Sequence, residues 1–188
     1  MTGRPRDPAV DDAIRRATVE LAEQNGYRGV SMEGIAARSG VSKQAIYRRY
    51  ANKGEVILDA VAAYARNHLP TPDTGDLRED LLTLLERTFA GQRGINGALN
   101  RALAAEALQD ETFAKRLSEH HIRHRRDAVR EIISRARDRG EITRLDDDFL
   151  IDLVFGPMWY ALMFDGGKLT DEYAATLADA IVASARTS

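Results

Sequence analysis

The chain has 188 residues, and its 44% hydrophobic and 30% charged residues, with a formal net charge of −2, are typical of a globular protein with a real core. The length suits a small module joined to a larger one, and no apolar run approaches the roughly 18 residues needed to cross a bilayer. The absence of cysteine excludes disulfides, thiolate catalysis and cysteine-based zinc sites, and it is compatible with a reducing cytoplasm.

The N-terminal segment "MTGRPRDPAVDD" lacks the apolar core of a secretory signal, so we expect a cytoplasmic protein that is not attached to a membrane. Hydrophobic residues at spacings of four, three and four then predict a first helix. Asp7 and Pro8 are suited to its start, because Asp caps free N–H groups and Pro fits the first helical position. Asn25 and Gly26 predict its end, since Gly accepts a positive φ.

Two short helices joined by a tight turn are predicted next. Ser31 is expected to cap the first of them, over residues 32–39, and Ser42 is expected to cap the other, which runs to about Tyr50. The turn between them needs Gly40, because we expect a positive φ at this position. Three helices with such a turn form a helix-turn-helix, in which the outer face of the third helix is free to enter a major groove.

Positive charge gathers on this third helix, although the chain as a whole is slightly acidic. Residues 1–55 carry ten Lys and Arg against seven Asp and Glu, whereas the remainder carries seventeen against twenty-two. Lys, Arg and Gln can bond to base edges, and hydroxyl and cationic groups can bond to phosphates, as can free N–H groups at helix starts such as the one at Ser31. The expected base contacts are Lys43, Gln44 and Arg48, and the expected phosphate contacts are Ser42, Tyr47, Arg49 and Lys53.

The alternative is a solvated basic helix on an ordinary bundle. The glycine turn and the Tyr and Gln interleaved with the charges favour double-stranded DNA as the partner.

The segment "VSMEGIAARSGVSKQAIYRRYANKGEVIL" resembles the DNA-binding module of the TetR family of bacterial transcriptional regulators, over about residues 8–60. The resemblance implies that Ser42, Tyr47 and Lys53 clamp phosphates while Lys43, Gln44 and Arg48 face bases. The chain departs from the family at Tyr50, where Phe or Trp is commoner, and the Tyr50 hydroxyl needs a partner or water. The residues that match the family pattern are Ser31, Ile35-Ala36, Gly40-Val41-Ser42, Ile46-Tyr47, Tyr50 and Lys53.

Nearly all of the remaining chain is predicted to be helical, so the fold class is all-α, with about nine helices. We expect a helix-turn-helix DNA-binding domain at residues 1–52 and a helical ligand-binding and dimerisation domain at residues 53–188. The segment "LPTPDTGD" is the clearest break, and it falls inside the larger domain because the fourth helix links the two parts. Helices four to nine are predicted at about 53–68, 77–89, 98–108, 111–139, 146–164 and 170–185. The eighth of them, at 146–164, is expected to break or to start late at Gly156-Pro157.

The last two predicted helices carry more large apolar side chains than a lone helical hairpin can bury. These side chains either close the core of the monomer or pair with a second copy, and we expect a homodimer because two-fold operators match two-fold proteins. The resemblance implies the same interface, since the last two helices of TetR-family protomers usually form a four-helix bundle across a two-fold axis. The apolar residues are Leu150, Leu153, Val154, Trp159, Leu162, Leu177, Ile181 and Val182.

An inducer pocket in the larger domain is implied by the resemblance. His121 and His124 follow the apolar stripe of the seventh helix and could hydrogen-bond a buried ligand. His120 and His124 have the spacing to share a metal ion, but the neighbouring arginines argue against a cation, so no metal site is expected. The other candidates for the lining, any of which could instead belong to the core, are Tyr64, Phe89, Phe113, Phe155, Met158, Trp159, Met163 and Phe164.

These patterns predict a homodimeric transcriptional regulator, in the first place a repressor, that binds a near-palindromic operator and responds to a small-molecule inducer without a cofactor. One alternative is a DNA-binding structural protein without an effector, which a filled core in the larger domain would favour. Another is an enzyme with a metal ion at Asp146, Asp147 and Asp148. These carboxylates are better suited to the start of the eighth helix, and no nucleophile–base pair is legible, so we expect no enzymatic activity.

Overall fold

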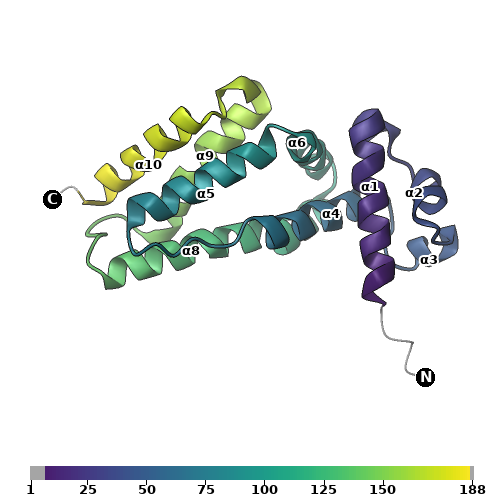
Figure 1. Cartoon of the computed structure of the whole chain (residues 1–188), viewed down its shortest axis with the longest axis horizontal. Coiled ribbons are helices and arrows are strands. Elements are labelled where there is room, and N and C mark those ends of the chain that lie inside the picture. The colour runs from purple at the N-terminus through teal and green to yellow at the C-terminus, as the bar shows by residue number, and fades with distance from the viewer. Residues whose placement is uncertain (1–6, 187–188) are drawn as a thin grey trace.

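The structure, a computed structural model, describes residues 7–186, and every regular element in this range is a helix, as predicted. Figure 1 shows an elongated molecule whose head, at one end, consists of α1 (Pro8–Gly29), α2 (Met32–Ser39) and α3 (Lys43–Tyr47). From the head, α4 (Lys53–His68) leads into a larger bundle at the other end. No helix in the described part of the chain is long and apolar enough to span a bilayer.

The first helix begins and breaks where the sequence predicts. The carboxylate of Asp7 accepts a hydrogen bond from the N–H of Ala9 (3.0 Å), and Pro8 occupies the first helical position. Gly26 interrupts the helix with a φ of 66°, and a last turn continues to Gly29. The predicted end of the helix therefore lies at the break, which lets the chain change direction toward α2.

The helix-turn-helix depends on two serine caps and one glycine. The side chain of Ser31 accepts a hydrogen bond from the first turn of α2 (3.0 Å), and that of Ser42 accepts one from the first turn of α3 (3.2 Å). Gly40 has a φ of 70°, which confirms the left-handed conformation expected at the turn. The prediction for the third helix was too long, because α3 ends at Tyr47 and only a turn over residues 48–49 separates it from Tyr50.

The larger bundle contains the remaining predicted helices. Their bounds are α5 (Leu77–Gln92), α6 (Ile95–Ala107), α7 (Glu111–Leu117), η1 (Ser118–Ile122), α8 (Arg123–Asp138), α9 (Asp147–Phe164), η2 (Gly166–Lys168) and α10 (Asp171–Arg186). The predicted seventh helix is present as α7, the π-helical turn η1 and α8 in direct succession. Because this one predicted helix receives two labels, α7 and α8, the nine predicted helices correspond to α1–α10 within the described residues.

The helix α9 is continuous, although the sequence predicted a break or a late start at Gly156-Pro157. Proline lacks an N–H and normally weakens a helix interior. Buried side chains on both sides of the proline, among them Val154, Met158 and Ala161, anchor this helix in the bundle core. Tertiary packing therefore outweighs the local preference for a break.

Two hydrophobic cores organise the molecule. One lies among α5, α8, α9 and α10 and includes Leu81 and Ile132. The other joins the head to α4, α6 and α7, since Ile35 and Ile46 of the head belong to the same buried cluster as Leu103 of α6. The domain boundary after residue 52 remains a prediction, and the core of the head continues across it into the larger bundle.

Candidate functional site

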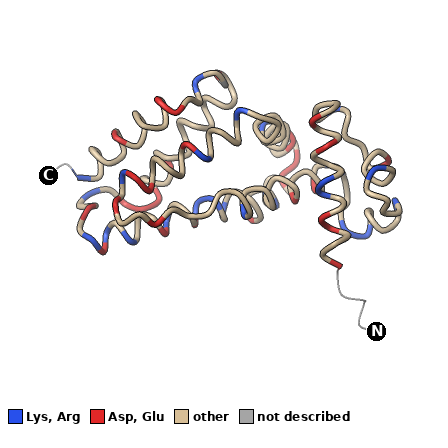
Figure 2. The backbone as a smooth tube through the Cα atoms, viewed as in Figure 1, with Lys and Arg blue, Asp and Glu red and all other residues tan. Residues whose placement is uncertain are grey.

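The outer face of α3 is the first candidate site. Ile46 is fully buried and fixes the orientation of this short helix, so that Lys43, Gln44, Tyr47 and Arg48 are left exposed. Figure 2 shows basic positions on the α2–α3 side of the head, whereas α1 carries both acidic and basic positions. The four predicted groups therefore lie together on an exposed surface of the size and chemistry that suits a major groove.

Lys43 is the most constrained of these exposed residues. Its ammonium group pairs with Glu33 of α2 and lies 5.7 Å from the centre of the Tyr47 ring. The pair is exposed to solvent, so it contributes little to stability, and the lysine can exchange its partner for a phosphate or a base.

Arg49 and Lys53 are not part of this exposed group. The guanidinium of Arg49 donates to Asp11 of α1 (2.9 Å) and to the carbonyl of Ala45 (3.0 Å), and its side chain is only 14% exposed. The geometry thus assigns Arg49 to holding α3 against α1 and does not favour its predicted phosphate contact. Lys53 lies 4.5 Å from the centre of the Tyr27 ring and is partly exposed at the start of α4.

Tyr50 has the partner that its hydroxyl needs. It donates a hydrogen bond to Asp59 of α4 (2.7 Å), and Arg15 of α1 donates to the same carboxylate oxygen (2.8 Å). Burial and the hydrogen bond to Asp59 raise the pKa of Tyr50 far above its ordinary value, so the hydroxyl stays protonated. One carboxylate on α4 therefore holds both the first helix and the end of the helix-turn-helix.

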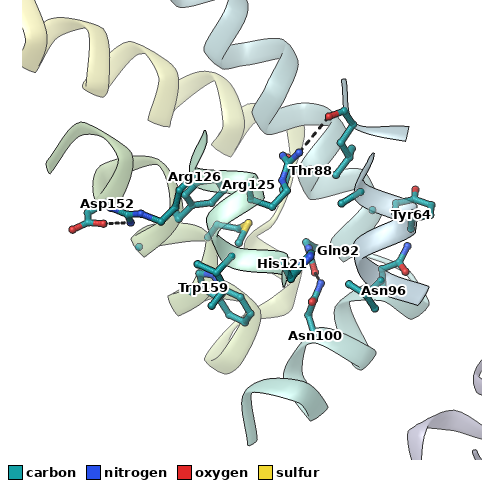
Figure 3. A pocket seen from close by; sticks show the side chains of 18 residues that line it. Tyr64, Thr88, Gln92, Asn96, Asn100, His121, Arg125, Arg126, Asp152 and Trp159 are labelled. Atoms are coloured by element: carbon teal, nitrogen blue, oxygen red, sulfur yellow. Dashed lines mark hydrogen bonds and ion pairs between the residues drawn. The ribbon is translucent and has the colours of Figure 1, made fainter. Parts of the chain in front are cut away.

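The second candidate site is a cavity of about 280 Å³ in the larger bundle, lined by residues of α4, α5, α6, η1, α8 and α9. Figure 3 shows polar side chains from several of these elements, Asn100 and Arg125 among them, around the cavity. Its predicted lining residues are Tyr64, His121, Phe155, Met158 and Trp159.

The other predicted pocket residues do not line this cavity. Phe89 is fully buried in the core of the bundle and stacks on Tyr173, with the ring centres 5.9 Å apart, and Phe113 is buried in the core shared with the head. His124, Met163 and Phe164 are exposed. An aromatic side chain alone therefore does not indicate whether a residue lies in the core, in the cavity wall or on the surface.

The misplacement of His124 has a cause in the backbone. Buried residues recur at every fourth position along the continuous run of α7, η1 and α8. They are Phe113, Leu117, His121, Arg125, Val129 and Ile133. A regular α-helix would drift by about 40° at each such step, and the wider π turn at η1 compensates for part of this drift. The residue that faces the cavity after His121 is therefore Arg125 and not His124.

Three buried polar residues of the cavity were absent from the predicted lining: Thr88, Asn100 and Arg125. Arg125 is 7% exposed and donates hydrogen bonds to the hydroxyl of Thr88 (3.0 Å) and to the carbonyl of Leu69 (3.3 Å). Burial lowers its pKa to about 10, a value at which it still carries its charge at neutral pH. The fourfold spacing from Phe113 is the signal that could have found Arg125.

His121 is buried in its neutral form. Burial, followed by the positive charges of Arg125 and His124, lowers the pKa of His121 to about 4. Within residues 7–186 no three His, Cys, Asp or Glu side chains come together as a metal site. The Asp146 side chain instead accepts a hydrogen bond from the first turn of α9 (2.8 Å), as expected of a cap.

Comparisons with known protein families match both parts of the chain to the same family of bacterial regulators. A family model described as bacterial regulatory proteins of the tetR family matches residues 14–60, and one described as the C-terminal domain of tetracyclin repressor-like proteins matches residues 71–181.

Individual relatives match nearly the whole chain. The HTH-type transcriptional regulator YdeS of Bacillus subtilis is 31% identical over 93% of this chain and 89% of the relative. The DNA-binding transcriptional repressor TetR of Mycobacteroides abscessus is 28% identical over 90% of each protein. The solved structure of the TetR family transcription regulator SCO0332 is 27% identical, with a TM-score of 0.82 over 92% of this chain and 96% of that one.

Proposed function

The chain belongs to the TetR family of bacterial transcriptional regulators, and we propose that it is a ligand-responsive repressor that acts as a homodimer on a near-palindromic operator. It is therefore a DNA-binding regulator and not an enzyme. The proposal keeps the predicted division into a DNA-binding part at residues 1–52 and a ligand-binding and dimerisation part at residues 53–188.

In this proposal α3 enters the major groove. Lys43, Gln44 and Arg48 read base edges, because all three are exposed on the same short helix. Tyr47 is 46% exposed and supplies a hydroxyl to a phosphate, and Lys53 supplies its charge from the start of α4. Ser42 and Ser31 mark helix starts whose N–H groups support the same backbone contacts.

In this proposal the homodimer forms through α9 and α10. The apolar residues predicted for this interface lie in the core of the single chain or pack against it: Leu150, Val154, Leu162, Leu177, Ile181 and Val182 are buried, and Leu153 and Trp159 are partly buried. The support for the interface comes instead from other residues of α9. Large apolar side chains of α9 are exposed in the single chain, including Phe149 (48%), Tyr160 (66%) and Phe164 (77%). Such a group of exposed aromatic residues on one helix is costly in water and is typical of an interface. A two-fold pair of protomers places two copies of α3 in successive major grooves, about 34–36 Å apart.

The response to a ligand passes along α4. Tyr64 of α4 lines the cavity, and Asp59 of the same helix holds Tyr50 and Arg15 of the head. A ligand that shifts α4 therefore acts on both contacts at once and changes the spacing of the two heads. A coupling of about 1–3 kcal/mol is typical of such effectors.

A cavity of about 280 Å³ also supports a ligand-responsive regulator over the alternative function. A structural DNA-binding protein without an effector has no need of such a space, and its larger domain would be packed to the density of an ordinary core. We therefore prefer the ligand-responsive regulator.

The observation that carries the proposal is the exposed face of α3, which has no acidic residue. This face belongs to the second helix of a pair that is capped by serines and joined by a glycine turn. The test is selection of bound duplexes from a random DNA pool by the full chain. We expect enrichment of an inverted repeat, and Gln44→Ala should change the enriched bases while leaving the repeat spacing unchanged. Enrichment of a single half-site would contradict the homodimer, and no enrichment at all would contradict sequence-specific regulation.

A further inference from the structure

Arg125 is a buried cation without a described counter-ion. It is 7% exposed, and its two hydrogen-bond acceptors, the hydroxyl of Thr88 and the carbonyl of Leu69, are both uncharged. A guanidinium has five N–H donors, so several remain free for a further partner. Removing a charge from water is costly unless an opposite charge compensates for it, so this arginine provides strong attraction for an anion.

Its neighbour Arg126 shows the contrast. Arg126 also lines the cavity, but its guanidinium pairs with Asp152 and Asp148 of α9. The charge of Arg126 is therefore balanced within the protein. Of these two adjacent arginines, only Arg125 lacks a described carboxylate partner, and it is the more deeply buried of the two.

His121 adds a second unsatisfied group on the same wall. It is 8% exposed, and its Nδ1 atom has no hydrogen-bond partner among the described residues. A neutral histidine can carry its proton on Nδ1, and that N–H would then donate to an anion bound by Arg125. Two buried groups that can donate to the same ligand thus face a cavity that contains no unpaired carboxylate among the described residues.

Most of the remaining lining is apolar. Phe155, Met158 and Trp159 of α9 form one side of the cavity, and Val61 and Ala65 of α4 contribute to another. A fully hydrated ion such as inorganic phosphate would leave these surfaces without contacts, whereas a hydrocarbon group attached to the anion would bury them. The volume of about 280 Å³ suits a small molecule.

From these features we propose that the cavity binds a small apolar carboxylic acid, whose carboxylate is held by Arg125 and His121 and whose hydrocarbon part packs against Phe155, Met158 and Trp159. This inference rests on the proposed function, because it names the chemical class of the effector of the proposed repressor. Arg is suited to the role, since its planar guanidinium binds a carboxylate through two parallel hydrogen bonds.

The test uses acid and amide pairs that differ in charge but hardly in shape. Phenylacetate is compared with phenylacetamide, and hexanoate with hexanamide, by titration calorimetry on the full chain at pH 7. We expect at least one acid to bind about ten-fold or more tightly than its amide, because a buried charge-assisted hydrogen bond is lost with the charge.

Two arginine variants provide the matched comparison. Arg125→Gln should reduce the preference for the acid to about one, whereas Arg130→Gln should retain it, because Arg130 lies on the same helix but outside the cavity and pairs with Asp127 and Asp148. Circular dichroism of both variants checks that each is folded. Since the acid and amide comparison is made first on the unaltered chain, the inference stays testable even if Arg125→Gln does not fold.

Three results would overturn the inference: equal affinity for acid and amide, no binding of either acid at millimolar concentration, or a preference that survives in Arg125→Gln. A DNA-binding measurement on the selected operator separates this failure from failure of the proposed function. If the chain binds the operator but neither acid, the proposed class of effector is wrong and the proposed function as a regulator is retained. If no operator is bound, the proposed function itself fails.

Discussion

The head and the cavity both present cations to a partner, but they hold these cations in opposite surroundings. Lys43 and Arg48 of the head are exposed to water, and Lys43 already shares its charge with Glu33. Arg125 of the cavity is 7% exposed and has no described carboxylate beside it. A solvated cation costs the folded protein little, whereas a buried unpaired cation destabilises it until an anion arrives.

This difference predicts how the affinity of each site depends on salt concentration. Charges in water are screened by salt within about 10 Å, and contacts with DNA also release counterions. Buried charges are screened much less. The same chain should therefore combine one binding reaction that depends strongly on salt with another that scarcely does.

The largest expected effect is this contrast in salt dependence. Lys43, Arg48 and Lys53 of two protomers would bring six positive charges among the phosphates and displace their counterions, whether the side chain bonds to a base or to a phosphate. Operator affinity should therefore fall about 10³-fold between 50 and 200 mM salt. The affinity of the cavity for the preferred acid should change less than about three-fold over the same range. Fluorescence anisotropy for DNA and calorimetry for the acid give the two slopes. Equal slopes would remove the distinction between the two sites.

The next largest effect is a loss of protein stability at low pH, caused by His121 in the cavity wall. The pKa of His121 falls from 6.5 to about 4 on folding, so between these pH values the unfolded chain binds a proton that the folded chain does not. Acidification from pH 6.5 to 4 should therefore remove up to about 3 kcal/mol of the free energy of unfolding. Urea unfolding at several pH values measures this loss.

The variant His121→Asn should flatten that part of the profile, because it removes the titrating ring. His120→Asn is the matched control: the neighbouring ring is exposed, and its removal should leave the profile as it is. The charged groups around His121 are Arg125 and His124 of α8 and Arg66 of α4. A profile that is the same in the unaltered chain and in His121→Asn would show that this histidine is not the group responsible.

A smaller effect is expected where the two regions meet. Tyr50→Phe removes the hydrogen bond to Asp59 but keeps the ring and the Arg15–Asp59 contact, so stability should fall by about 1–2 kcal/mol. If α4 transmits the response, this variant should also weaken the effect of the acid on operator binding. Tyr27→Phe is a useful comparison, since its hydroxyl donates to Glu106 of α6 (2.7 Å) and not to α4.

The smallest effects should come from single phosphate contacts of the head. Tyr47→Phe should weaken binding to all sequences alike by about 0.5–1.5 kcal/mol, without a change in salt slope, because the tyrosine is uncharged. Lys53→Ala should reduce the slope by about one unit per half-site. Arg49→Ala should instead lower stability, because Arg49 pairs with Asp11. Anisotropy titrations at several salt concentrations distinguish these three outcomes.

The organisation of the head could be predicted because its determinants are local in sequence. Ser31 and Ser42 cap the helices that directly follow them, and Gly40 takes the positive φ that the turn requires. The exposed face of α3 then follows from helical geometry. Arg49 was the exception, since its partner Asp11 lies on another helix and no local rule connects the two.

The cavity could be predicted only in part, because its wall is assembled from six separate elements. The helical pattern alone placed His124 in the pocket, and the π turn at η1 put Arg125 there instead. Phe89 and Tyr64 are both aromatic residues on helices of the bundle, yet one fills the core and the other faces the cavity. That difference depends on how helices cross, which the spacing of residues within one helix does not specify.

The central claim is that α3 of each protomer lies in a major groove. Guanine N7 methylation interference on the selected operator tests it most directly, because the methyl group blocks the major groove alone. The account predicts two clusters of interfering guanines whose centres are separated by about one helical turn, 10–10.5 base pairs, or by a multiple of that distance. Interference confined to minor-groove adenine N3, or none from N7, would contradict it.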